Sequence, residues 1–177
     1  MKTSTEKKYL PEFVYGAIDG IVTTFAVVAG SLGASLSSSI ILILGFANLF
    51  ADGFSMAVSN YLSIKSQNEL LTKKEQKHEH IKNPKKTALA TFTAFVVIGF
   101  IPLISFVLAP LIPAISDSKF FYSIILTILA FLIVGAIKGK VTQTSKLKSA
   151  IGTLLIGGIA AMIAFFVGYL LKTIVGV

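Results

Sequence analysis

The chain has 177 residues, 54% of them hydrophobic, and a mean hydropathy of +0.83. This composition excludes an ordinary soluble domain and is typical of an integral membrane protein. There is no cysteine, which excludes disulfides and thiolate metal sites, and the net charge of +8 comes entirely from lysines.

Long apolar runs occupy most of the sequence, and each is close to or above the roughly 20 residues that a helix needs to cross a bilayer. Because the runs are continuous, without the apolar-polar alternation of a membrane β-barrel, they predict an all-α protein. Pro102 is expected to kink the third span, and Pro110 and Pro113 to mark its outer end. The five predicted transmembrane helices are residues 14–34, 40–63, 87–109, 120–138 and 149–171.

The lysines cluster at alternate ends of these spans. They precede the first span, fill the segment 65–86 between the second and third, and join the fourth to the fifth, whereas the opposite side keeps only Lys119 and Lys172. Lysine-rich short loops stay cytoplasmic, so this pattern predicts a cytoplasmic N-terminus rather than a nucleic-acid-binding surface. We expect residues 1–177 to form a single membrane domain, with segment 65–86 extending the second helix and ending before Pro84.

Polar residues inside the first two spans form stripes at helical spacing. The first span carries Asp19 with Thr23 one turn later, and Glu12 lies seven residues earlier on the same side. Residues of the second span stand at three- and four-residue steps along one stripe: Asn48, Asp52, Ser55, Met56, Ser59 and Asn60. Ionised aspartates are costly in a bilayer and usually face a partner, water or an ion. If the stripes face each other they line a path; alternatively, they only bond helices together.

The donor types on these stripes suit a divalent cation. Carboxylate and amide oxygens alone fit Mg²⁺, Ca²⁺ or Mn²⁺, whereas the thioether of Met56 adds a preference for a transition metal. One chain offers fewer than the six or so donors such ions take, and a two-fold homodimer would double them. Gly16 and Gly20 form a G-x-x-x-G beside Asp19, which favours close helix packing, and a dimer axis there is one hypothesis. Because metal binding requires carboxyl groups to release protons, the pattern also favours proton-for-metal exchange.

A second candidate metal site lies in the cytoplasmic segment. Glu75, His78 and Glu79 stand at i, i+3 and i+4, a spacing able to capture a divalent ion on a helix. The many lysines around them favour instead a solvated charged segment.

The sequence lacks the motifs of the competing functional classes. No G-x-x-x-x-G-K-[ST] loop is present to power a pump, and no histidine lies in a span, which excludes an H-E-x-x-H metalloprotease. We therefore predict a protein that is not an enzyme and needs no cofactor other than a transported ion. The remaining alternative is a membrane scaffold or accessory subunit whose polar residues only pack helices.

Four stretches resemble the vacuolar iron transporter family over nearly the whole chain: "YGAIDGIVTTFAVVAG" from Tyr15, "GFANLFADGFSMAVSNYLSIKSQ" from Gly45, "VGAIKGKVT" from Val134 and "LLIGGIAAMIAFFVGYLL" from Leu154. The resemblance implies a five-span homodimer that exports Fe²⁺ or Mn²⁺ from the cytoplasm in exchange for protons. Its path would lie at the dimer interface, between the first and second spans.

By the same resemblance, Asp19 matches the family's first-span acid, Met56 its second-span methionine and Glu12 its acid at the cytoplasmic entrance. Asp52 falls in the family's Ala-Asp-Gly, and Asn60 stands where plant and fungal members often have glutamate. The family's longer, glutamate-rich cytoplasmic region is shortened here to a lysine-rich segment, which leaves metal storage there open. The short form favours a prokaryotic plasma membrane, or a vacuolar or other endomembrane in a eukaryote; preference between Fe²⁺ and Mn²⁺ stays open.

Overall fold

The computed structural model describes residues 2–73 and 82–176, and these residues form helices joined by turns. Among the described residues, five helical segments are long and apolar enough to cross a membrane, namely Lys8–Gly33, Ser38–Leu71, Pro84–Leu108, Lys119–Val141 and Lys146–Val175. The prediction of an all-α chain with five spans is therefore confirmed. Each segment contains most or all of one predicted apolar run, because lipid offers no hydrogen bonds to backbone groups and a helix lets an apolar run satisfy nearly all of its own.

In the described part of the chain, eight helical elements make up these spans and their connections. They are α1 (Lys2–Gly33), α2 (Ser38–Lys73), α3 (Pro84–Gly99), the short 3₁₀ turn η2 (Ile101–Leu103), α4 (Ile104–Leu108), α5 (Pro113–Ser116), α6 (Lys119–Val141) and α7 (Lys146–Val175). α2 continues well past the apolar run, as predicted for the start of segment 65–86. α3 begins at Pro84, where the Asn83 side chain accepts from the backbone N–H groups of Lys85 and Lys86 and caps the helix.

The third span is interrupted at Pro102, as the sequence predicts. Proline has no backbone N–H, and the helix changes here from α3 through η2 to α4. The hydroxyl of Ser123 on α6 donates to the carbonyl oxygen of Pro102 at 2.6 Å. A side chain of a neighbouring span thus bonds a backbone carbonyl at the interruption, as membrane helices require.

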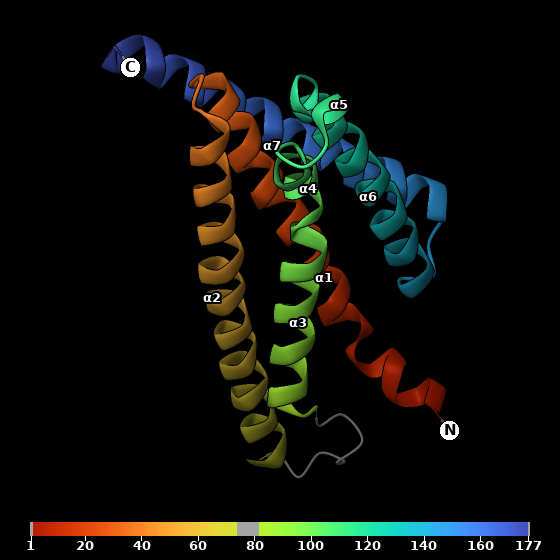
Figure 1. Ribbon diagram of the computed structural model, residues 1–177. Coiled ribbons are helices and arrows are strands. Elements are labelled where there is room, and N and C mark those ends of the chain that lie inside the picture. The colour runs from red at the N-terminus through yellow and green to blue at the C-terminus, as the bar shows by residue number, and fades with distance from the viewer. Residues whose placement is uncertain (1, 74–81, 177) are drawn as a thin grey trace.

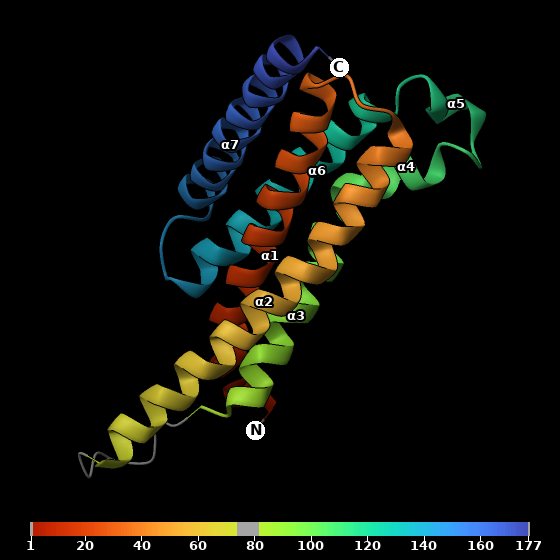
Figure 2. The ribbon, with the colours of Figure 1, turned by 90° about the vertical axis from the view of Figure 1, so that its left-hand side faces the viewer.

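α1 is the central helix of the bundle. It contacts α2 and α3 on one side and α6 and α7 on the other, and Figures 1 and 2 show these two pairs flanking it. α2 and α3 run side by side in both views, while α7 crosses obliquely to them (Figure 1).

Glycines allow α1 to approach its neighbours closely. A Cβ atom on Gly16 would lie 2.4 Å from the carbonyl oxygen of Thr91, and one on Gly20 would lie 2.5 Å from that of Phe95, both on α3. On α7, a Cβ on Gly168 would lie 2.0 Å from the carbonyl oxygen of Gly30. The G-x-x-x-G of the first span therefore packs α1 against α3 within one chain, so this motif is not the contact of a dimer axis.

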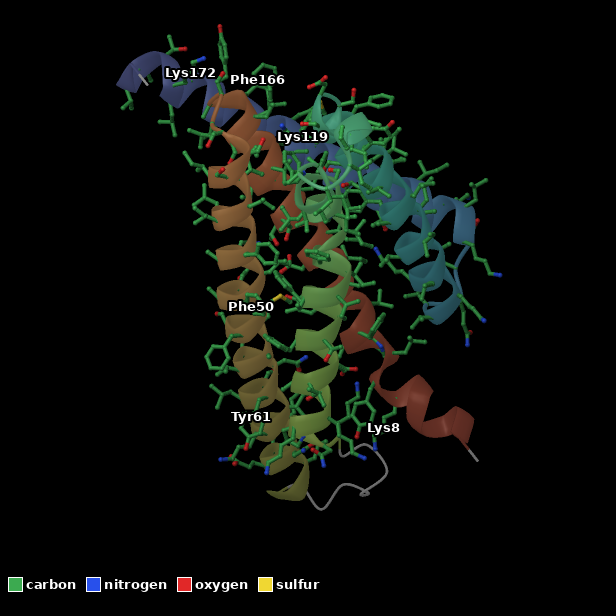
Figure 3. The ribbon with its side chains drawn as sticks, in the orientation of Figure 1. Lys8, Phe50, Tyr61, Lys119, Phe166 and Lys172 are labelled. Atoms are coloured by element: carbon green, nitrogen blue, oxygen red, sulfur yellow. The ribbon has the colours of Figure 1, made fainter. Side chains whose placement is uncertain are left out.

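The two ends of the bundle differ in the residues they carry. Figure 3 shows Lys8 and Tyr61 toward the end where the chain passes from α2 to α3, and Lys119 and Lys172 at the opposite end. We call the former the lysine-rich end, since it also holds Lys65, Lys82, Lys85 and Lys86. The alternation of lysines along the sequence is thus reflected in the folded chain.

Candidate metal path

A groove of about 550 Å³ lies between α1 and α2 toward the lysine-rich end. Glu12 and Tyr15 of α1 line one side, and Met56 and Asn60 of α2 line the other. The remaining lining residues are Pro11, Ser55, Ser59, Ser63, Ile64 and Gln67. This α1–α2 groove therefore brings a carboxylate, a thioether and an amide to one hollow, together with several hydroxyls.

Glu12 is the acid of this groove, and it is only 8% exposed. One carboxylate oxygen, Oε1, lies 2.6 Å from Nζ of Lys82. The other oxygen, Oε2, is buried and has no hydrogen-bond partner among the described residues. One oxygen of the carboxylate is thus left without a partner among the described residues.

Met56 has two sets of neighbours. It packs against a buried apolar cluster that includes Leu49 and Phe95, and it also lines the α1–α2 groove. Its position is compatible both with ordinary packing and with a sulfur ligand at the groove wall.

Asn60 is fixed by α3. Its Nδ2 donates to Oγ1 of Thr91 at 2.6 Å, and Thr91 in turn donates to the carbonyl oxygen of Thr87 at 3.0 Å. With its nitrogen engaged, the amide has its carbonyl oxygen Oδ1 as the group left for the groove. Asn60 therefore combines a contact between helices with a neutral oxygen donor.

A second polar group continues the path away from the lysine-rich end. Nδ2 of Asn48 lies 3.3 Å from Oγ1 of Thr23 and 3.5 Å from Oγ1 of Thr24, which ties α2 to α1. Between this contact and the groove lie Asp19 and Asp52, close enough for their carboxyl groups to interact electrostatically. The bonds of Asn48 thus join the polar stripes of α1 and α2 at this level of the bundle.

Asp19 does not line the α1–α2 groove. It lines a separate hollow of about 530 Å³ between α1 and α6, together with Tyr15 and Lys138. Within one chain, Asp19 and Met56 therefore border different hollows, and Pro11 and Tyr15 line both of them. The described residues contain no group of three or more His, Asp or Glu side chains that would hold an ion by themselves.

The groove also contains three polar residues that were not predicted to line the path, Tyr15, Ser63 and Gln67. Ser55, Ser59, Ser63 and Gln67 follow one another at four-residue steps, so continuing the polar stripe by two more turns would have found the last two. The three residues proposed for cytoplasmic metal capture, Glu75, His78 and Glu79, lie outside the described residues.

Together these features define a class, an integral membrane protein of five spans with a polar groove between its first two. Comparison with known sequences adds the family: the sequence model of the VIT family matches residues 10–82 and 71–169. The chain belongs to the VIT family.

Named relatives cover almost the whole chain. A vacuolar iron transporter of Toxoplasma gondii is 29% identical over 98% of this chain and 78% of its own length. Vacuolar iron transporter 1 of Arabidopsis thaliana is 30% identical over 93% of this chain and 86% of its own. That of Eucalyptus grandis is 28% identical over 91% and 86%, respectively.

The relatives are longer within the matched region. The alignment with the Toxoplasma protein spans 235 positions, whereas this chain has 177 residues, so the relative carries segments that this chain lacks. The two ranges matched to the family overlap at residues 71–82, from the last residues of α2 toward α3, where the sequence predicts a shortened segment.

Proposed function

We propose that the protein is a secondary transporter that exports Fe²⁺ or Mn²⁺ from the cytoplasm in exchange for protons. The observation that carries the proposal is the α1–α2 groove, where Glu12, Met56 and Asn60 line one hollow and one oxygen of Glu12 has no hydrogen-bond partner among the described residues. Mixed oxygen and thioether donors favour a transition metal over Mg²⁺ or Ca²⁺. The names of the relatives, vacuolar iron transporters, support iron as one substrate.

The arrangement suggests a stepwise path. An ion would enter at Glu12 on the lysine-rich end, pass Met56 and Asn60, and reach Asp19 and Asp52 deeper in the bundle. Thr23, Asn48, Ser55 and Ser59 would line the way. The carboxylates must release protons to bind metal, so inward proton movement would accompany metal export. No further cofactor is needed for this cycle.

We propose that the working unit is a two-fold homodimer. Ser55 and Ser59 are exposed on a membrane-spanning face in the single chain, and the side chain of Tyr15 is 61% exposed. A second copy covering this face would exclude lipid from the polar stripe and double the donors, which one chain supplies in too small a number. The shortened segment between α2 and α3 supports a prokaryotic plasma membrane as the location of this single membrane domain.

One observation favours the alternative of a scaffold whose polar residues only pack helices. The amides of Asn48 and Asn60 are both engaged between helices, with α1 and α3. The alternative does not account for the free carboxylate oxygen of Glu12 or for two aspartates where neutral residues would bond helices at lower cost.

Flux measurements on purified protein in liposomes test the proposal. We expect Fe²⁺ and Mn²⁺ release from loaded vesicles, accelerated by an opposing proton gradient, and loss of flux in Asp19→Ala. The absence of protein-dependent flux would favour the scaffold, and flux that Asp19→Ala leaves unchanged would remove Asp19 from the path. Flux that is independent of the proton gradient would remove proton coupling and leave metal transport in place.

A further inference from the structure

We propose that Lys82 is a tethered counter-ion of Glu12, which a divalent metal ion must displace in order to enter the α1–α2 groove. This proposal rests on the proposed transport function and concerns the control of its entrance. It assigns to one lysine of the shortened segment between α2 and α3 a direct part in ion selection.

The need for a counter-ion follows from the burial of Glu12. An ionised carboxylate with only 8% of its residue surface exposed requires a nearby positive charge. Nζ of Lys82, 2.6 Å from Oε1, supplies it. The second oxygen, Oε2, has no hydrogen-bond partner among the described residues, so an arriving cation has an oxygen to contact as it displaces the lysine.

Lys82 is held in place by both helices that form the groove. Nδ2 of Asn68 on α2 donates to the carbonyl oxygen of Lys82 at 2.7 Å. The backbone N–H of Asn83 donates to the hydroxyl of Tyr9 on α1 at 3.3 Å. These bonds anchor the backbone of the lysine beside Glu12 and keep its ammonium group at high effective concentration there.

The lysine side chain can nevertheless leave, because 30% of it is exposed to solvent. A monovalent cation has no charge advantage over an ammonium group that is already tethered at the site. A divalent cation attracts the carboxylate with twice the charge at equal distance. The tether therefore raises the concentration of metal needed to occupy the groove and discriminates against monovalent ions.

Equilibrium binding of Mn²⁺ to the purified full chain tests this proposal. In Lys82→Gln we expect the apparent Kd for Mn²⁺ to fall by about two- to fivefold, the range for a partly exposed ion pair. Lys82→Arg, which keeps the charge, should retain the wild-type Kd. Lys86→Gln is the control for surface potential, because it removes an equal charge from an exposed lysine on the first turn of α3. Thermal melting checks that every variant is folded.

A double mutant makes the test specific to the pair. In a Glu12→Gln background, Lys82→Gln should no longer change the Kd, because the carboxylate for which lysine and metal compete is gone. An unchanged Kd in Lys82→Gln, or an equal decrease in Lys86→Gln, would overturn the proposal while leaving transport intact. A wild-type protein that neither binds nor moves Mn²⁺ or Fe²⁺ would overturn the proposed function and this inference together.

Discussion

The amide nitrogen of Asn60 lies 2.6 Å from the hydroxyl oxygen of Thr91, across the contact between α2 and α3. This bond orients a side chain of the candidate path from a helix that does not itself line the α1–α2 groove. It links the packing of the third span to the chemistry between the first two. Changes in Thr91 should consequently alter both stability and the position of a donor.

We expect Thr91→Val to lower stability by about 1 kcal/mol, because Asn60 loses its acceptor while the volume at position 91 is kept. Thermal unfolding in detergent measures the effect. Combining Thr91→Val with Asn60→Ala should cost less than the sum of the two single changes, since both remove the same bond. Fully additive losses would show that the two residues act independently.

The glycines of α1 give a prediction about packing. Gly20→Ala places a Cβ 2.5 Å from the carbonyl oxygen of Phe95, so α1 must move away from α3, at a cost of about 1–3 kcal/mol. Gly158→Ala on α7 is the matched control, because no atom lies within 4 Å of its added Cβ. A clear drop in melting temperature is expected for Gly20→Ala alone, and equal melting of both variants would contradict the close approach.

A substitution at Met56 distinguishes a role in packing from a role as a metal ligand. Met56→Leu keeps the volume that packs against the apolar cluster, so folding should change by less than about 1.5 kcal/mol. The loss of the sulfur should weaken Fe²⁺ binding by about tenfold, equal to about 1.4 kcal/mol. Met162→Leu, on a 56% exposed side chain of α7, serves as the control. Unchanged metal affinity in Met56→Leu would assign this methionine to packing alone.

Metal affinity should depend on pH with a defined sign. Protons and metal ions compete for the same carboxylate oxygens, so the apparent Kd should rise as the pH falls, by up to about tenfold per pH unit for each proton released. Mn²⁺ binding measured from about pH 6 to about pH 8 gives the slope. A Kd that is constant over this range would exclude proton release on binding.

The absence of cysteine from the chain allows a direct test of the dimer. A single Ser59→Cys places a thiol on the exposed stripe of α2, and we expect it to cross-link to a second copy under mild oxidation when the two Cα atoms lie within about 7 Å. Leu155→Cys, on a 60% exposed side chain of α7, should remain monomeric under the same conditions. Cross-linking at α7 but not at α2 would place the interface on the other side of the bundle.

Much of the fold follows from the sequence because lipid imposes simple rules. A span must be apolar, helical and long enough to cross, so hydropathy alone places all five, and Pro102 marks the interruption of the third. The four-residue steps of α2 also place Met56 and Asn60 on one face. These features depend on local sequence, which is why they could be predicted.

Contacts between residues that are distant in the sequence were harder to predict. Nothing in the G-x-x-x-G of the first span indicates which helix it packs against, and the structure shows α3 of the same chain rather than a second copy. The pairing of Glu12 with Lys82 joins residues 70 positions apart. It depends on where α2 ends and α3 begins, and one lysine among many carries no local signal for it.

The central position of α1 has a consequence for how the protein is made. This span is synthesised first, yet α3, α6 and α7, which cover most of it, emerge later. Until they arrive, Asp19 and the glycine faces of α1 stand in the bilayer or insertion machinery beside α2 alone. Assembly is therefore complete only when the last span packs against Gly30. A chain that stops after α2 would leave α1 without the three helices that contact most of its surface.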